Sequence, residues 1–262
     1  MAVKLACRSI TFRYGKTDIL HDISFSVKPG SFCAILGRNG SGKTTLLHCL
    51  NGIHRPHTGK IFINNKNLAV MPRNEIARHV SLVPQEHLEI FPFKVIDVVV
   101  MGRAPFIGMT RTPSKKDYQL ALKALETFNA RKLAGCNFNK ISGGERQIAL
   151  LASAIVQTSE IMLLDEPTNH LDFNNQYLLL KNIKQLCKSR ETSVIASMHD
   201  PNMAMLFADA VVMIKNGKII AHGPAKNIMT KENIDTLYDT NTATLAISKT
   251  KHFFLPDEII NG

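Results

Sequence analysis

The chain has 262 residues, of which 45% are apolar, and this is enough to form a large globular core. Its 32 Lys and Arg against 21 Asp and Glu give a net charge of +11, so its surface attracts anions such as nucleic acid or lipid headgroups without specifying either. No apolar stretch reaches the roughly 20 residues of a membrane span, and the N-terminus lacks the apolar segment of a secretory signal. We therefore expect a cytosolic protein whose five scattered cysteines are reduced thiols.

The first predicted functional element is a phosphate-binding loop at residues 37–44. The apolar run Phe32–Leu36 predicts a buried strand before it, and Lys43–Leu50 predicts a helix after it that ends at Gly52. The residues that match the loop pattern, with the threonine that follows, are Gly37, Arg38, Asn39, Gly40, Ser41, Gly42, Lys43, Thr44 and Thr45. In such a loop backbone N–H groups surround phosphate oxygens, the lysine reaches the β- and γ-phosphates, and the first threonine binds Mg²⁺. The pattern therefore predicts ATP and Mg²⁺ as ligands.

A second anion site is indicated by the run 141–147, far from the loop in sequence. Gly143 and Gly144 leave backbone N–H groups uncovered at the start of a predicted helix, and Ser142 adds a hydroxyl donor. Ser142 and Glu145 also have the spacing of a capping box, so a capped helix is the simpler interpretation of the run by itself. The two interpretations are compatible, because a capped helix can still face a nucleotide.

Two further predicted strands end in residues suited to phosphate chemistry. The run Ile161–Leu164 leads to Asp165 and Glu166, where parallel strands present their ligands. We assign Asp165 to the metal and Glu166 to orienting and deprotonating the attacking water. A third strand, Ser193–Ser197, leads to His199, which we expect to hydrogen-bond the γ-phosphate, although a histidine in this position by itself is more often structural.

The order of these motifs resembles that of the ATP-binding subunits of ABC transporters, over nearly the whole chain. The matching elements are Tyr14, the loop 37–44, Gln85, the run 141–147, Asp165 with Glu166, the turn 169–172, and His199. The resemblance implies an α/β P-loop NTPase fold with a parallel core sheet, an N-terminal antiparallel β subdomain and a helical insertion. We expect one ATPase domain, 1–262, in which 1–85 and 159–262 form the nucleotide-binding core and 86–158 form the helical subdomain.

The resemblance also implies roles for individual residues. Tyr14 would stack on adenine, Gln85 would sense Mg²⁺ and the attacking water, and Asp172 would couple two ATP sites in a head-to-tail homodimer. An aromatic residue at a strand end is the alternative for Tyr14. The residues that would bind the γ-phosphate held by the partner chain are Ser142, Gly143 and Gly144. The family more often carries Gln in the place of Glu145, so the role of this acid stays open.

Two shorter segments are similar to the ATP-binding subunits of importers of siderophore-iron, haem and cobalamin. These carry Gly-Arg-x-Pro and Leu-Asp-x-x-x-Gln, which match Gly102–Pro105 and Leu171–Gln176. A relative that imports molybdate shares such features, so the cargo stays open. The resemblance implies a polytopic permease as partner, indirect contact with an external binding protein, no nucleic acid, and a peripheral location on the cytoplasmic face of the membrane.

Several alternatives remain at this stage. The apolar, proline-rich segment from Phe91 to Phe106 is either a docking face for the permease or a locally packed loop. Residues 240–262 are either a packed tail or a second dimer contact. Soluble ABC proteins that act on ribosomes share part of the motif set, but they usually carry two cassettes in one chain. A small-molecule kinase would explain only the phosphate loop.

Overall fold

The computed structural model describes residues 4–85, 92–108, 111–169, 171–248 and 251–258. The strands are β1 (Leu5–Tyr14), β2 (Thr17–Val27), β3 (Phe32–Leu36), β4 (Thr58–Ile63), β5 (Lys66–Asn67), β6 (Val80–Val83), β7 (Ile161–Leu164), β8 (Ser193–Met198), β9 (Ala210–Lys215), β10 (Lys218–Pro224), β11 (Thr242–Ser248) and β12 (Lys251–Pro256). The α-helices are α1 (Lys43–Leu50), α2 (Arg73–His79), α3 (Val95–Met101), α4 (Lys115–Glu126), α5 (Gly143–Val156), α6 (Phe173–Arg190), α7 (Pro201–Phe207), α8 (Ala225–Ile228) and α9 (Lys231–Tyr238). Short 3₁₀ turns are η1 (Leu68–Val70), η2 (Ala104–Phe106), η3 (Arg131–Leu133) and η4 (Phe138–Lys140).

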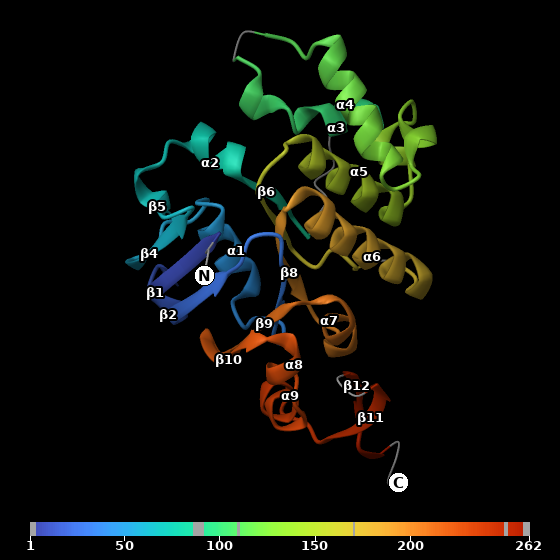
Figure 1. Ribbon diagram of the computed structural model, residues 1–262. Coiled ribbons are helices and arrows are strands. Elements are labelled where there is room, and N and C mark those ends of the chain that lie inside the picture. Colours follow the sequence, from blue (N-terminus) through green and yellow to red (C-terminus); the bar gives the residue numbers. More distant parts are fainter. Residues whose placement is uncertain (1–3, 86–91, 109–110, 170, 249–250, 259–262) are drawn as a thin grey trace.

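The central sheet of the molecule has the strand order β10-β9-β3-β8-β7-β6 (Figure 1). Neighbouring strands run parallel except for β10, which pairs antiparallel with β9. Along β3, Phe32, Ala34 and Leu36 pack into one hydrophobic cluster. The two residues between them pack into the other, because successive side chains of a strand point to opposite faces. A strand that is covered on both faces must be apolar throughout, which is why the sequence predicts β3 and β7 to the residue.

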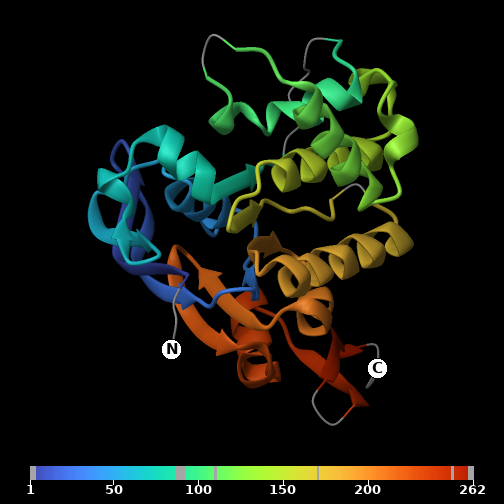
Figure 2. The same ribbon diagram turned by 45° about the horizontal axis from the view of Figure 1, so that its top comes forward.

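Different layers cover the two faces of this sheet (Figure 2). Helix α1 and the antiparallel sheet β2-β1-β4-β5 share one hydrophobic cluster with it, in which Leu46, Leu47 and Leu50 are fully buried. Residues of α5, α6 and α7 belong to the other cluster. Helix α1 has the predicted bounds, and Gly52 just beyond it has a φ of +69°. The predicted α/β fold with an N-terminal antiparallel sheet is confirmed, whereas the subdomain boundaries at 85 and 158 stay a prediction.

Helices α3, α4 and α5 pack on one another in the region between β6 and β7, and two adjacent residues join them. Gly102 lies against α5 so closely that a Cβ atom there would come within 2.1 Å of the Ser153 carbonyl oxygen. The Arg103 guanidinium donates to Asp117 Oδ1 at 3.0 Å and to the Val156 carbonyl at 3.1 Å, and it lies 4.3 Å from the ring centre of Phe106. This packing explains why a glycine and an arginine stand at positions 102 and 103. Of the apolar segment that follows Gln85, Phe91 lies outside the described residues.

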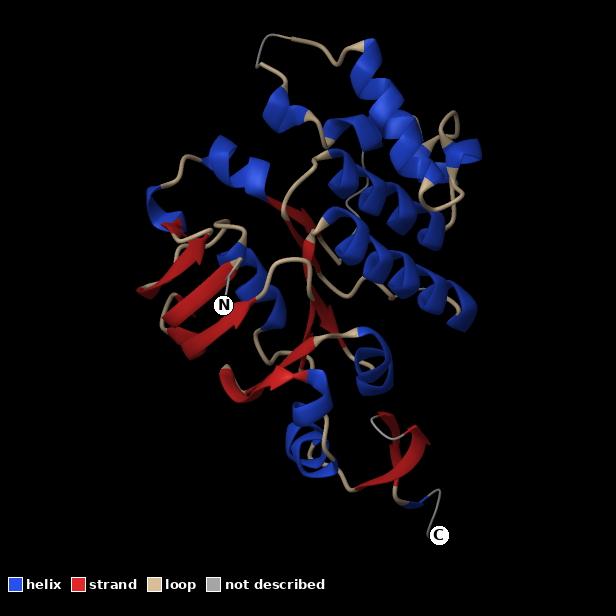
Figure 3. Cartoon of the chain, in the orientation of Figure 1, coloured by secondary structure: helices blue, strands red, loops and turns tan. Residues whose placement is uncertain are grey.

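The C-terminal residues form a packed hairpin of β11 and β12 (Figure 3). Phe254 is 5% exposed and belongs to the main hydrophobic cluster, and its backbone N–H and carbonyl both bond to the side-chain amide of Asn202 on α7. Strand β12 is therefore packed on the molecule, whereas Leu245 and Ile247 of β11 are 55% and 47% exposed, so the second dimer contact stays an alternative for this segment.

The five cysteines are free thiols, and four of them are buried while Cys136 is exposed. The absence of disulfides among them agrees with the expectation of reduced thiols. Among the residues that the structure describes, no helix combines the length and the apolar character of a membrane span.

Helix α4 begins with a capping box that provides a pH-dependent stability test. Ser114 Oγ accepts from the Asp117 N–H, while the Asp117 carboxylate accepts from Ser114 and Arg103. The Ser114 hydrogen bonds and Arg103 lower the pKa of Asp117 to about 2. The stabilisation is therefore present above the ordinary carboxyl pKa and lost as pH falls from about 4 towards 2. Asp117→Asn should lower the free energy of unfolding by about 1 kcal/mol at pH 7.

The measurement is urea unfolding of the wild type and the variant at pH 7 and at pH 3, where their difference should shrink. Asp18→Asn, a change at an exposed residue of β2, is the matched control and should shift stability by less than about 0.5 kcal/mol at either pH. An Asp117→Asn effect of equal size at both pH values would contradict the role of the ionised carboxylate.

Candidate active site

The predicted phosphate loop joins β3 to α1 and is shaped by its glycines. Gly42, the N-cap of α1, has a φ of +103°, and Gly40 has a φ of +78°, both in the region that favours glycine. At Gly37 a Cβ atom would lie 2.4 Å from the carbonyl oxygen of Ile214 on β9. Around Gly40, by contrast, a Cβ atom would meet nothing within 4 Å. The loop is therefore packed tightly at its start and open at its tip, where a ligand can approach the backbone.

Lys43 and Ser41 are the buried polar side chains of this loop. The Lys43 ammonium donates to the carbonyl oxygens of Gly37 at 2.9 Å and Arg38 at 3.2 Å, and its side chain is 4% exposed. Burial lowers the pKa of Lys43, and the nearby carboxylates of Glu166 and Asp165 oppose that shift. The Ser41 hydroxyl is buried and has no hydrogen-bond partner among the described residues. The loop thus presents a desolvated cation and an unpaired donor, which suits an anionic oxygen ligand.

Asp165 and Glu166 follow β7 and are held by one residue of the neighbouring strand. Ser197 Oγ donates to Asp165 Oδ1 at 2.6 Å and accepts from the Glu166 N–H at 2.8 Å, and both groups are buried. Glu166 has a φ of +48°, an uncommon conformation for a residue with a side chain. One hydroxyl of Ser197 therefore fixes the Asp165 carboxylate and the backbone of Glu166.

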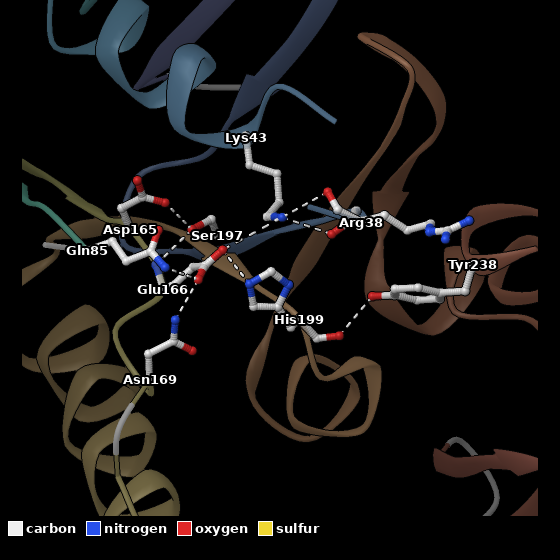
Figure 4. Close-up of polar contacts among 10 residues, drawn as sticks. Arg38, Lys43, Gln85, Asp165, Glu166, Asn169, Ser197, His199 and Tyr238 are labelled. Atoms are coloured by element: carbon white, nitrogen blue, oxygen red, sulfur yellow. Dashed lines mark hydrogen bonds and ion pairs between the residues drawn. The ribbon is translucent and has the colours of Figure 1, made fainter. Parts of the chain in front are cut away.

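The Glu166 carboxylate is surrounded by donors from four segments (Figure 4). Its Oε2 accepts from Gln85 Nε2 at 2.7 Å and from Asn169 Nδ2 at 2.6 Å. Its Oε1 pairs with His199 Nε2 and lies 3.8 Å from Lys43 Nζ. Four of the predicted catalytic residues, Glu166, His199, Gln85 and Lys43, therefore meet at one carboxylate. A base in this position is oriented on both oxygens and stands beside the phosphate loop.

A pocket opens over this carboxylate at the tip of the loop. Its lining residues are Ile19, Asn39, Gly40, Gly42, Lys43, Thr44, Thr45, Gln85 and Glu166. Thr44 is exposed there, whereas Thr45 is buried. Tyr14 does not line this pocket; its ring is 49% exposed, and its hydroxyl lies 2.6 Å from Nε2 of His54. No cluster of three or more His, Cys, Asp or Glu side chains placed to hold a metal occurs in the part of the chain that the structure describes.

The second predicted anion site lies apart from this pocket within the chain. Ser142 caps α5 in a capping box with Glu145, whose carboxylate accepts from the Ser142 backbone and hydroxyl at 3.0 Å each. The cap is confirmed, and it gives Glu145 a structural role. A separate pocket beside Ser142 and Gly144 is lined by residues of α5 and α6, by Leu171, and by Phe128 and Asn129 after α4, and it contains no residue of the phosphate loop. Asp172 caps α6 by accepting from the Asn175 N–H at 2.8 Å, and His170 lies outside the described residues.

Sequence reasoning missed the individual roles of Ser197 and Asn169, although both lie within the predicted segments. A hydroxyl at the C-terminal end of a buried strand is a weak signal, since most such residues only satisfy the backbone. Gln176, the last residue of the Leu-Asp-x-x-x-Gln match, had no role assigned from the sequence. Its amide donates to the carbonyls of Thr168 at 3.3 Å and Leu171 at 3.1 Å. The Gln176 side chain therefore stabilises the turn that precedes α6.

Comparison with known proteins decides the family. A model of the ABC transporter family matches residues 20–169, which include the phosphate loop, the run 141–147 and Glu166. The chain belongs to the ABC transporter family. It is the ATP-binding and ATP-hydrolysing subunit of such a transporter.

Relatives of this ABC ATPase are similar over most of their length. A protein of Helicobacter pylori that is named as an iron chelatin transport ATP-binding protein is 38% identical to this chain. The match covers 90% of this chain and 93% of the relative. A molybdate import ATP-binding protein of Haemophilus influenzae is 35% identical over 89% of this chain and 87% of its own. A solved chain of an inward-facing ABC transporter assigned to the metal-chelate type is 32% identical, with a TM-score of 0.86 over 98% of this chain and 100% of the other.

Ser197 of this ATPase can be tested by its effect on stability. Ser197→Ala removes the donor to Asp165 and the acceptor of the Glu166 N–H, and it leaves two buried polar groups unpaired. We expect the free energy of unfolding, measured in urea, to fall by about 2–3 kcal/mol. Ser31→Ala is the control, since its hydroxyl makes an exposed bond to Lys28, and it should cost less than about 1 kcal/mol. Equal effects of the two variants would contradict the bridging role of Ser197.

Proposed function

We propose that this ABC ATPase powers the import of a metal chelate, such as siderophore-iron, haem or cobalamin, through a membrane permease. The observation that carries the ATPase mechanism is the Glu166 carboxylate beside the phosphate loop, which accepts hydrogen bonds from Gln85 and Asn169 and forms ion pairs with His199 and Lys43. The cargo class is supported by the iron chelatin relative and by the metal-chelate type structure. The molybdate relative is nearly as similar to this chain. The proposed cargo class therefore rests on the named relatives and not on the residues of the ATP site.

ATP would bind at the tip of the phosphate loop. Backbone N–H groups between Gly37 and Thr45 and the buried hydroxyl of Ser41 would receive the phosphate oxygens. Lys43 would exchange its present contacts with loop carbonyls for the β- and γ-phosphates. Tyr14, half exposed at the end of β1, would stack on the adenine ring.

The oxygen donors of the site fit Mg²⁺ that arrives with the nucleotide. Thr44 presents an exposed hydroxyl, and Asp165 has a carboxylate oriented by Ser197. Gln85 donates its amide N–H to Glu166, which leaves its amide oxygen as a ligand. Hard oxygen ligands of this kind are those that Mg²⁺ prefers, and the bound cation would neutralise phosphate charge.

Hydrolysis would use Glu166 as the general base. A water molecule between this carboxylate and the γ-phosphorus would give its proton to Glu166 while its oxygen forms the new P–O bond and ADP leaves. His199, now paired with Oε1, would donate a hydrogen bond to the γ-phosphate, and Gln85 would hold the water. Asn169 would keep the Glu166 carboxylate oriented while His199 and Gln85 turn to the phosphate and the water.

The complete site would need two copies of the chain. Ser142 and Gly144 at the N-terminus of α5 line a pocket that is separate from the phosphate loop, and Gly143 lies between them at the first position of the helix. In a head-to-tail homodimer they would bind the γ-phosphate held by the partner chain, and Asp172 at the start of α6 would couple the two sites. The dimer would sit peripherally on the cytoplasmic face of the membrane, where its movement acts on the permease and only indirectly on an external binding protein.

Glu166→Gln separates binding from hydrolysis. The amide keeps the size of the side chain but cannot accept the proton of the attacking water. We expect ATP binding to persist and the steady-state rate of phosphate release to fall by about 10²–10³-fold. Near-normal turnover in this variant would remove Glu166 as the base.

Lys43→Ala provides the opposite pattern, because it removes the cation from the phosphate loop. ATP affinity, measured by equilibrium binding, should fall by about tenfold or more. Lys66→Ala, which breaks an ion pair with Glu75 on the surface, should leave affinity unchanged. Unaltered ATP affinity in Lys43→Ala would contradict the role of the loop.

Transport is tested by co-purification of the tagged full chain from membranes. A stable complex with a polytopic membrane protein in detergent, retained at high salt, is the expected result. Uptake of a radiolabelled iron chelate that depends on Glu166 would then support the cargo class. Salt-sensitive binding to ribosomes without a membrane partner would instead favour a soluble ABC ATPase and overturn the importer.

A further inference from the structure

Two adjacent residues at the end of α9 contact the two loops that flank the proposed ATP site. The hydroxyl of Tyr238 donates a hydrogen bond of 2.9 Å to the backbone carbonyl of His199 (Figure 4). The carboxylate of Asp239 accepts one of 3.1 Å from Arg38 in the phosphate loop. The C-terminal part of the chain thereby reaches both the phosphate loop and the residue that follows β8.

The two contacts differ in strength. Arg38 and Asp239 have side chains that are 60% and 56% exposed, and an ion pair so open to water contributes little. The bond from Tyr238 is partly buried. Burial raises the pKa of the Tyr238 phenol, and the charge of Asp200 raises it further, so the hydroxyl remains a donor at physiological pH. The tyrosine contact is therefore the one able to constrain its partner.

Tyr238 is itself held in place by the packing of α9. Ile234 and Leu237 on this helix are buried at 1% and 0% exposure. Lys215 of β9 donates to the Thr236 carbonyl at 2.7 Å and to the Asp239 carboxylate at 2.5 Å, at the point where Asp239 ends the helix with a φ of +52°. The phenol thus projects from a helix that is fixed to the central sheet.

His199 is therefore constrained at two points. Its ring pairs through Nε2 with Glu166, and its carbonyl accepts from Tyr238. The next residue, Asp200, caps α7, so the His199 peptide lies between the end of β8 and a helix start. We propose that Tyr238 is a positioning residue that fixes the His199 peptide and thereby aims its ring at Glu166 and the γ-phosphate. This inference rests on the role proposed for His199.

Tyr238→Phe tests the proposal by removing the hydroxyl while keeping the ring. We expect kcat for ATP hydrolysis, per folded molecule, to fall by about fivefold to tenfold, as for one lost hydrogen bond. The KM and the binding affinity for ATP should stay within about twofold, because the phosphate loop is untouched. Tyr118→Phe is the matched control: it removes a hydroxyl that donates to Asp97 at 3.3 Å in the helical region, and it should leave kcat unchanged.

A double-mutant cycle with His199→Ala shows whether Tyr238 acts through the histidine. In single-turnover measurements, Tyr238→Phe should lower the rate in the wild-type background and have no further effect in His199→Ala. Additive losses in the double variant would mean that the tyrosine acts independently of His199 and would overturn the proposal. A Tyr238→Phe variant that loses stability in urea but keeps the wild-type kcat per folded molecule would also overturn it, since the tyrosine would then serve the fold only.

The outcome is separable from that of the proposed function. If the wild type hydrolyses ATP and Glu166→Gln does not, the ATPase mechanism stands. A kcat of Tyr238→Phe equal to that of Tyr118→Phe would then reject only the positioning role.

Discussion

The structure around the proposed ATP site depends on the buried carboxylate of Glu166. A charge that is 8% exposed is costly unless donors surround it, and here they come from α1, the end of β6, the turn after β7 and the residue after β8. These segments are far apart in sequence. They meet because β3, β8, β7 and β6 are consecutive neighbours in a parallel sheet, so their C-terminal ends lie at one edge.

Around that carboxylate the chain builds two layers of support. The first contacts Glu166 directly, and Lys43 within it also donates to two carbonyls of the phosphate loop. The second holds the first: Ser197 fixes the backbone of Glu166, and Tyr238 contacts the backbone of His199. Side chains that must act at a defined angle need such supporting bonds, because a lone strand-end residue is free to rotate.

The starts of α1 and α5, which are the two proposed anion sites of this chain, lie at different pockets. The loop before α1 opens beside Glu166, whereas the start of α5 opens beside α6 and Leu171. In the proposed ATP cycle these two pockets would be half-sites, which a head-to-tail pair of chains would bring together. The close packing of Gly102 on α5 and the three contacts of Arg103 join α5 to α3 and α4.

The sequence by itself determined the elements whose cause is local. Strands β3 and β7, helix α1 and the cap at Ser142 were predicted to the residue, because an apolar run, a glycine pattern or a three-residue spacing is complete within a few positions. Only the tertiary structure decided the left-handed turn at Glu166, the packed C-terminal hairpin and the bond from Tyr238 to His199, which are 39 residues apart. Those features depend on which surfaces pack together in three dimensions, and no short stretch of sequence contains both partners of such a contact.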